Sequence, residues 1–240
     1  MIVKQLRHRI PKFSHRITPV QKVNARTQEQ GLTLIECLVA IVVVGLVSSA
    51  IAPALVLSVA TRVHSQKAEQ ALALAQSQID STRVLVERGE YTVADLPPLA
   101  TGLADRDVAT APGPNLGVTN PTNFAYAQPV DIDGDGQPDF LVQRFRAIGE
   151  SVGGTPVAFA MGVRVYDRAA SATGNLSTTP ASLVMTSTGG RRNERPLATL
   201  YTTIATSNQG ESLCNLITYV NSGVAAGSRK TLPTICTVGP

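Results

Sequence analysis

The chain has 240 residues, of which 43% are hydrophobic and 4% aromatic, and its formal net charge is +4 at pH 7. The charge is uneven, since seven of the 21 Lys and Arg residues but only one of the 17 Asp and Glu residues lie within Met1–Gly31. The remainder is slightly acidic, which gives no reason to expect a nucleic-acid-binding domain. After the apolar segment, enough chain remains for one folded core.

The basic leader precedes a long apolar segment that begins with one acidic residue. From Cys37 to Thr61 the chain has no charge, and this length satisfies the requirement of about 20 apolar residues for a membrane-spanning helix. A cleaved secretory signal is one alternative, but the run exceeds a typical signal core. A plain membrane anchor leaves Glu36 unexplained, because a carboxylate at the membrane edge is costly unless paired. A cut after Gly31 would create a positive amine at Leu32, four residues before Glu36.

The sequence Gly-Leu-Thr-Leu-Ile-Glu at residues 31–36, followed by apolar sequence, resembles the cleavage and N-methylation motif of type IV pilins and type II secretion pseudopilins. The resemblance extends over residues 31–88. It implies that prepilin peptidase cuts after Gly31 on the cytoplasmic side and that Leu32 becomes the methylated first residue, although Phe is commoner there. It also implies that Glu36 neutralises the N-terminal amine of an adjacent subunit during assembly.

The helix is expected to continue to Arg88 and to stop at Gly89. Small and apolar residues recur at three- and four-residue intervals, while charged and amide side chains mostly occupy other faces. The recurring positions are Ala68, Ala71, Leu72, Ala75, Ile79, Thr82 and Val86. The predicted organisation is a basic leader at 1–31, a transmembrane and assembly helix at 32–61, its amphipathic continuation at 62–89 and a globular domain at 90–240.

Pro53 falls where helices of the resembled family often carry a proline with a part in assembly. A proline inside a helix removes one backbone hydrogen bond, so we expect a kink or local melting there. An incidental helix kink would explain the same residue without a filament.

The region after the helix is predicted to be a long connecting loop followed by strands. Residues 91–129 contain six prolines with several Gly, Ala and Asn residues, which favours a loop, with disorder as the alternative. At 157–165 apolar residues alternate with others, which predicts a half-buried strand. Further strands are expected at Phe140–Ala147, Ser182–Thr186, Leu197–Thr206 and Leu213–Val220. Such short strands favour an antiparallel meander. The predicted fold class is α+β, with a long N-terminal helix packed on an antiparallel sheet, as in pilins.

An acidic motif stands between the loop and the first of these strands. Carboxylates on alternate residues, with glycines that permit a tight turn, suit calcium, which needs six or more oxygen ligands. The motif resembles calcium loops found between strands in extracellular proteins, and it departs from an EF-hand because Val142 stands where that family has its closing glutamate. The implied ligands are Asp131, Asp133, Asp135 and Asp139 through their side chains and Gln137 through its carbonyl. An acidic hairpin turn without an ion is the alternative.

Two cysteines and three arginines remain in the C-terminal part. In an oxidising compartment a Cys214–Cys236 disulfide would close a loop of roughly 20 residues and contribute about 3 kcal/mol, whereas two separate buried thiols are the alternative. The basic cluster of Arg191, Arg192 and Arg195 could contact an anionic polymer such as a polysaccharide or a nucleic acid. A solvated loop explains it as well, because no aromatic residues interleave with it.

Catalysis is not expected. The chain has no histidine after His64, which removes the usual base of nucleophilic triads and the commonest zinc ligand, and no nucleotide-binding glycine pattern is present. The sequence therefore predicts a minor pilin or pseudopilin that is not an enzyme and carries calcium as its one candidate cofactor. The alternative is a membrane-anchored periplasmic calcium-binding or adhesion module that does not polymerise.

The leader's positive charges predict a cytoplasmic N-terminus and a single pass through the inner membrane, with the C-terminal domain in the periplasm before it enters a filament. The expected partners are prepilin peptidase, other pilin subunits and the inner-membrane assembly platform, with polysaccharide as a further candidate and no nucleic acid. The leader and the acidic loop also resemble those of cyanobacterial pilin-like proteins, including pseudopilins associated with polysaccharide secretion in gliding filaments.

Overall fold

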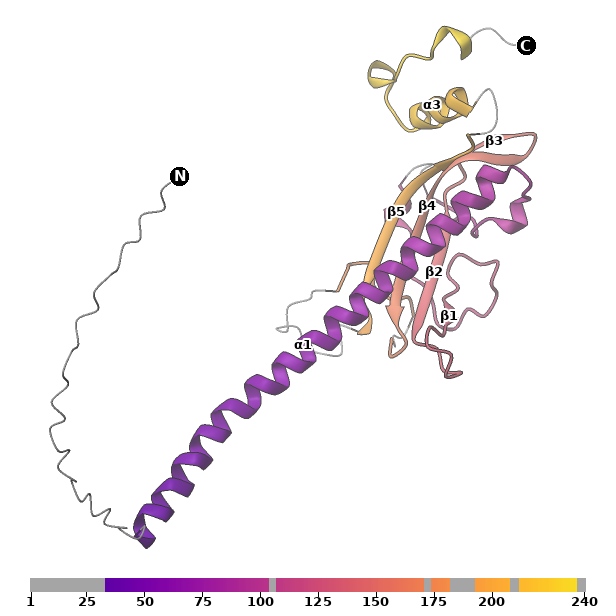
Figure 1. Ribbon diagram of the computed structural model, residues 1–240. Coiled ribbons are helices and arrows are strands. Elements are labelled where there is room, and N and C mark those ends of the chain that lie inside the picture. The colour runs from indigo at the N-terminus through magenta and orange to yellow at the C-terminus, as the bar shows by residue number, and fades with distance from the viewer. Residues whose placement is uncertain (1–32, 104–106, 171–173, 182–192, 208–211, 237–240) are drawn as a thin grey trace, which may run out of the picture. The chain divides into compact units, whose positions relative to one another are not determined.

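The computed structural model describes residues 33–103, 107–170, 174–181, 193–207 and 212–236. The chain divides into two units, Met1–Ile51 and Ala52–Pro240. Among the described residues, the first unit contains only the start of helix α1 (Leu34–Arg88). The second contains the rest of that helix, a sheet and helix α3 (Ser212–Ser222) (Figure 1).

The C-terminal half of α1 is amphipathic, as predicted. Its buried residues are Ala71, Ala75, Ile79, Thr82 and Val86, and their spacing of three and four residues places them on one face. The two alanines have no exposed surface, so the helix backbone can approach the sheet closely. Leu72, which belongs to the same sequence pattern, is instead 40% exposed. Gly89, with φ of 76°, follows the helix in the left-handed conformation that ends helices.

The five strands form one antiparallel sheet around a long central strand. They are β1 (Gln128–Val130), β2 (Phe140–Arg146), β3 (Glu150–Val152), β4 (Thr155–Asp167) and β5 (Ala198–Ala205). Strands β2 and β3 both pair with one edge of β4 and β5 with the other, since Ala158 is opposite both Glu150 and Ala205. Strand β1 lies outside β2. The predicted α+β fold with an antiparallel sheet is confirmed, and the strand predicted at 182–186 lies outside the described residues.

Strand β4 is buried on both faces, so the prediction of a half-buried strand was wrong. Phe159, Met161 and Val163 pack in the core that includes the buried face of α1, which crosses this side of the sheet (Figure 1). On the other face, Ala158 and Ala160 belong to a second core, whose further members come from the connecting segment, β2 and α3. Segments distant in sequence therefore cover the face that was expected to meet solvent.

The connecting segment packs against the second face of the sheet. It contains two short 3₁₀ helices, η1 (Val93–Asp95) and η2 (Val108–Thr110). Its buried side chains Ala100, Val108 and Ala111 belong to the second core, whereas Tyr91 and Leu96 belong to the first. In its described parts, 90–103 and 107–127, the segment is a packed loop, as predicted, rather than the disordered alternative.

A fully buried arginine on β4 holds this segment. The guanidinium of Arg164 donates to the carbonyls of Ala109 and Pro112, each at 3.0 Å, to the Tyr201 hydroxyl at 2.9 Å and to Gln143 Oε1 at 3.2 Å. It also lies over the Phe145 ring, 4.8 Å from the ring centroid. No carboxylate in the described parts of the chain pairs with it. Backbone and side-chain oxygens therefore meet the buried positive charge.

Close packing at this point also requires a glycine. A Cβ on Gly162 would lie 2.5 Å from Phe145 Cζ, which is closer than two carbon atoms can approach. The absent side chain leaves room for the aromatic ring on which Arg164 rests.

The strand predicted at 213–220 is wrong, because these residues form part of helix α3. Leu213, Leu216, Ile217 and Val220 are three and four residues apart, which is the spacing of a helix face. Their apolar composition also suited a strand in so short a segment. The helical conformation places Tyr219 in the second core, where it is 2% exposed.

An ion pair joins α1 to the end of β4. Lys67 Nζ lies 2.7 Å from Asp167 Oδ2, and the aspartate side chain is 17% exposed. The other oxygen of Asp167 accepts a hydrogen bond from the Ala169 amide at 2.9 Å. The pair thus fixes the helix near the turn that leaves β4.

Candidate functional site

The first turn of α1 places one carboxylate at the start of the uncharged N-terminal half of the helix. Thr33 precedes the helix, and its hydroxyl oxygen accepts a hydrogen bond from the Glu36 amide at 3.3 Å, as capping residues do. Glu36 is exposed, and the next charged residue along the chain is Arg62. Within residues 33–103 and the other described ranges, Glu36 has no ion pair. Its expected partner, the amine at Leu32, and the expected cleavage residue Gly31 lie outside the described residues.

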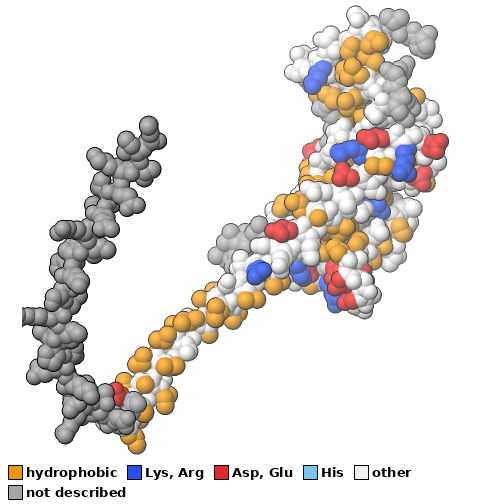
Figure 2. Space-filling view, viewed as in Figure 1, with side chains coloured by type: hydrophobic (Ala, Val, Ile, Leu, Met, Phe, Trp, Pro, Cys, Tyr) orange, Lys and Arg blue, Asp and Glu red, His pale blue; other side chains and the backbone are white. Residues whose placement is uncertain are grey.

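The residues after Glu36 present apolar side chains around the helix. Figure 2 shows hydrophobic side chains gathered along the N-terminal half of α1. Leu34 is 83% exposed and Ile41 73%, and α1 is long and apolar enough to cross a membrane. Exposed apolar area on this scale is unfavourable in water, so the segment requires lipid or other protein chains around it.

A comparison of the chain with protein families identifies this N-terminal segment. The family described as the prokaryotic N-terminal methylation motif matches residues 26–52. The match includes Gly31, Leu32 and Glu36 and ends one residue before Pro53. This motif marks type IV pilin-like proteins of the prepilin type, and the chain carries it at its N-terminus. No curated protein and no solved structure gives a significant match to it.

The motif is typical of one kind of protein. It implies processing by prepilin peptidase and assembly with other pilins, and it is typical of structural subunits. It also agrees with the apolar helix in indicating a membrane-anchored protein. The roles of Gly31, Leu32 and Glu36 as individual residues stay predictions, as do the domain boundaries.

Pro53 lies within α1 and does not end it. Proline has no amide hydrogen, so the carbonyl four residues earlier, that of Ser49, lacks its usual helical partner. The Ser49 hydroxyl itself donates to the Leu46 carbonyl at 2.8 Å. The expected local melting is therefore absent from the backbone of this pilin-like helix, and a role of Pro53 in assembly stays a prediction.

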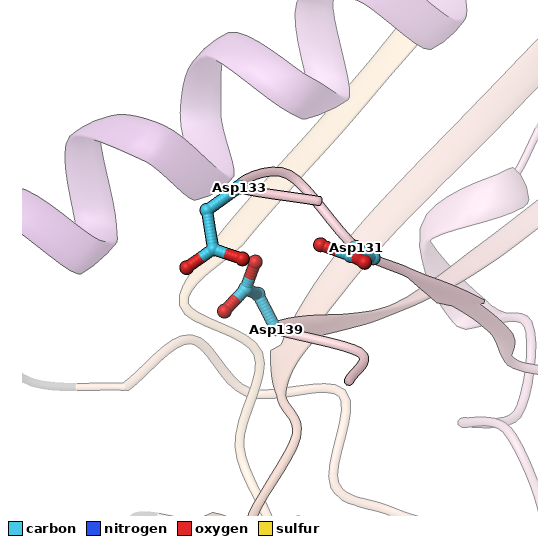
Figure 3. Close-up of side chains that lie close together, drawn as sticks. All are labelled: Asp131, Asp133 and Asp139. Carbon is cyan, nitrogen blue, oxygen red and sulfur yellow. The ribbon is translucent and has the colours of Figure 1, made fainter. Parts of the chain in front are cut away.

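The acidic motif forms the loop between β1 and β2 and brings three of its carboxylates together. Oxygens of Asp131, Asp133 and Asp139 lie within 4.8 Å of one another (Figure 3). Asp135 is not part of this group; its Oδ1 instead accepts the Gln137 amide hydrogen at 2.7 Å. Three of the four predicted side-chain ligands are thus neighbours.

Backbone amides of the loop point at Asp131. Its two oxygens accept hydrogen bonds from the amides of Gly134 at 2.7 Å and Gly136 at 2.8 Å. These bonds hold the pKa of the Asp131 carboxyl below its ordinary value. Both glycines have positive φ, 79° and 83°, a conformation that other residues adopt only with strain. The turn is therefore closed by its own hydrogen bonds, as the ion-free alternative requires.

The predicted pair of C-terminal cysteines forms a disulfide. Cys214 on α3 and Cys236 in η4 (Thr234–Cys236) are bonded, with their Cα atoms 5.5 Å apart. The bond ties the last described residues of the chain to α3. Cys37 is a free, exposed cysteine of the apolar segment. In the basic cluster, Arg191 and Arg192 lie outside the described residues.

The structure also contains a polar pocket that was not predicted. It lies between the connecting segment and β2 and is lined in part by Tyr126 and Arg144. The only sequence signal was Arg144, a charged residue within an apolar strand, which by itself is typical of an exposed strand position. Prediction of the pocket would have required the position of the connecting segment.

Proposed function

We propose that the chain is a minor pilin or pseudopilin, cut after Gly31 and assembled into a type IV pilus-like filament. The observation that carries the proposal is the lone carboxylate of Glu36 in the first turn of an exposed apolar helix. A charged side chain within the bilayer costs about 2.5–3.5 kcal/mol on insertion scales. An amine at Leu32 of a neighbouring subunit would offset this cost when subunits pack their apolar helices together.

The finer parts of this proposal concern place and process. Before assembly the subunit is inserted in the inner membrane, with its N-terminus in the cytoplasm and its folded domain in the periplasm. The oxidising environment of the periplasm suits the Cys214–Cys236 disulfide. The assembly platform then moves it into a filament that serves motility, uptake or secretion. Polysaccharide secretion is one candidate process among these. A membrane-anchored module that never polymerises is the competing function, and it leaves Glu36 without a partner.

Mass spectrometry of the mature N-terminus tests the proposal. We expect a chain that begins at N-methylated Leu32, and we expect Gly31→Leu to retain the whole leader, because a bulky residue would replace the small one before the cut. The full chain would be purified from membranes in each case. An intact leader in the unaltered protein, or a cut beyond Ala50 as for a secretory signal, would contradict it.

We further propose that the loop at 131–139 binds one calcium ion with a structural role. Two oxygens bound to the same calcium at roughly 2.4 Å lie at most about 4.8 Å apart, and the oxygens of Asp131, Asp133 and Asp139 satisfy this limit. The carboxylate oxygens of Asp131 have lone pairs beyond those used for the glycine amides. A cation bound between the three carboxylates would offset the repulsion between their negative charges.

The calcium proposal predicts a calcium-dependent change in stability. We expect calcium to raise the melting temperature of the full chain in detergent by a few degrees and Asp133→Asn to remove most of this increase. The amide oxygen of the variant can still accept the Asp135 N–H, a bond of 3.1 Å, so the turn should persist. Glu90→Gln, outside the loop, is the control. Equal destabilisation of Asp133→Asn in calcium and in chelator would indicate a plain turn.

A further inference from the structure

A pocket of about 240 Å³ lies on the domain between β2 and the connecting segment. Its polar lining consists of Asn123, Tyr126, Gln128 and Arg144, and Pro98 and Pro121 provide apolar sides. This volume is smaller than that of pockets for drug-sized ligands. The pocket therefore suits a single compact group, such as one sugar ring.

Arg144 supplies a positive charge that no described carboxylate neutralises. Its guanidinium donates to Gln128 Oε1 at 3.0 Å and forms no ion pair within the described ranges. Asp80 and Asp95 line a neighbouring hollow together with Arg144, but neither forms an ion pair with it in the described ranges. Asp80 pairs with Arg83 at 3.0 Å, and Asp95 accepts two hydrogen bonds from Thr92. Partial burial desolvates the guanidinium and lowers the pKa of Arg144, and attraction to an anion in the pocket would offset part of this cost.

The other polar groups of the pocket offer mainly hydrogen-bond donors. Gln128 Oε1 is occupied by Arg144, and Asn123 Oδ1 accepts the Ala125 amide hydrogen at 2.9 Å. Their amide nitrogens and the Tyr126 hydroxyl have no protein partner in the described parts of the chain, and Asn123 and Gln128 are exposed, so these groups are free to bind a ligand in place of water. A ligand that satisfies all of them carries one anionic group together with several further oxygen acceptors.

Contacts on the other face of β2 hold in place the part of the connecting segment that carries Asn123 and Tyr126. Gln143, on the opposite face of β2 from Arg144, donates through Nε2 to the carbonyls of Phe124 at 2.9 Å and Pro112 at 3.1 Å. The same residue accepts a hydrogen bond from the buried Arg164. Because these contacts fix the segment before Tyr126, little conformational freedom is lost when a ligand binds.

We propose that this pocket binds an acidic sugar residue of a polysaccharide. The sugar carboxylate pairs with Arg144, whose planar guanidinium matches a carboxylate. The apolar face of the ring packs on Tyr126, and the ring hydroxyls accept hydrogen bonds from Asn123 and Gln128. An acidic protein side chain would use the guanidinium and leave the amides to water, so the lining favours a sugar. The site lies within Ala52–Pro240 and does not depend on filament assembly.

Binding of defined oligosaccharides to the full chain in detergent tests the inference. We expect hexagalacturonate to bind and maltohexaose, a neutral chain of the same length, to bind at least about tenfold more weakly, since a charged hydrogen-bonded pair is lost. Arg144→Gln should weaken hexagalacturonate binding by about tenfold or more, and Tyr126→Ala should also weaken it. Arg168→Gln removes the same charge at an exposed turn outside the pocket and should leave binding unchanged.

Several results would overturn the inference. One is the absence of hexagalacturonate binding at millimolar concentration, and another is equal binding of maltohexaose. A third is an equal loss of hexagalacturonate binding in Arg168→Gln, which would indicate general charge attraction. Equally tight binding of polyglutamate would assign the pocket to an acidic peptide instead. Melting temperatures of all variants, measured in parallel, distinguish loss of the site from loss of the fold.

Discussion

Glu36→Gln is expected to abolish incorporation of the subunit into filaments while leaving its processing and membrane insertion intact. The substitution keeps the size of the side chain and removes its charge. An ion pair at about 4 Å is worth about 4 kcal/mol at an intermediate effective dielectric constant. Its loss would reduce incorporation by at least about a hundredfold. The cut after Gly31 should continue, because the resemblance places its specificity in the small residue before the cut.

Crosslinking in cells measures this effect directly. A photoreactive residue at Val44, which is 63% exposed, should crosslink to neighbouring subunits in the unaltered protein and not in Glu36→Gln. Glu36→Asp, which keeps the charge on a shorter side chain, should recover part of the crosslinking. Cys37→Ala is the matched control one residue away. Undiminished crosslinking in Glu36→Gln would mean that the carboxylate does not serve assembly.

Arg164→Met should destabilise the folded domain by about 2–4 kcal/mol, a large share of the 5–15 kcal/mol typical of globular proteins. The substitution removes the donor to Gln143 Oε1, whose residue is fully buried, and a buried group left without a partner costs about 1–3 kcal/mol. It also removes the part-buried hydrogen bonds to the Ala109 carbonyl and the Tyr201 hydroxyl. The Pro112 carbonyl keeps a partner in Gln143. The connecting segment should therefore loosen around η2.

Denaturant unfolding of the full chain in detergent gives the free-energy change, and hydrogen exchange of residues 107–126 reports the loosening. Arg168→Met, at an exposed position, should change stability by less than about 0.5 kcal/mol. Arg164→Lys should lie between the two, because an ammonium group cannot reproduce the planar set of donors. Equal stability of Arg164→Met and Arg168→Met would show that the arginine is not what anchors the segment.

Local sequence signals predicted the structure correctly where residues close together in the chain decide it. The uncharged run after Glu36 predicted the long helix, the spacing of Ala71, Ala75 and Ile79 predicted its buried face, and Gly89 predicted its end. The cysteines at 214 and 236 were predicted as a bonded pair and form one. Alternation in β4 correctly indicated a strand.

The failures occurred where distant segments decide the environment. Leu213–Val220 suits a strand by composition and a helix by the spacing of its apolar residues, and in the helix Tyr219 packs in the second core. The acidic loop was found in sequence, but the approach of Asp139 to Asp131 and Asp133, without Asp135, depends on how β1 and β2 pair.

By itself the sequence determined the prepilin-type N-terminus, the apolar helix and the antiparallel α+β class, because each depends on periodicity or on residues that are neighbours in the chain. Only the tertiary structure decided that β4 is covered on both faces, that Arg164 anchors the connecting segment and that Arg144 meets Tyr126 in a pocket. The physical reason is that long-range contacts, rather than local preference, determine whether a polar side chain meets solvent, a carbonyl or a ligand.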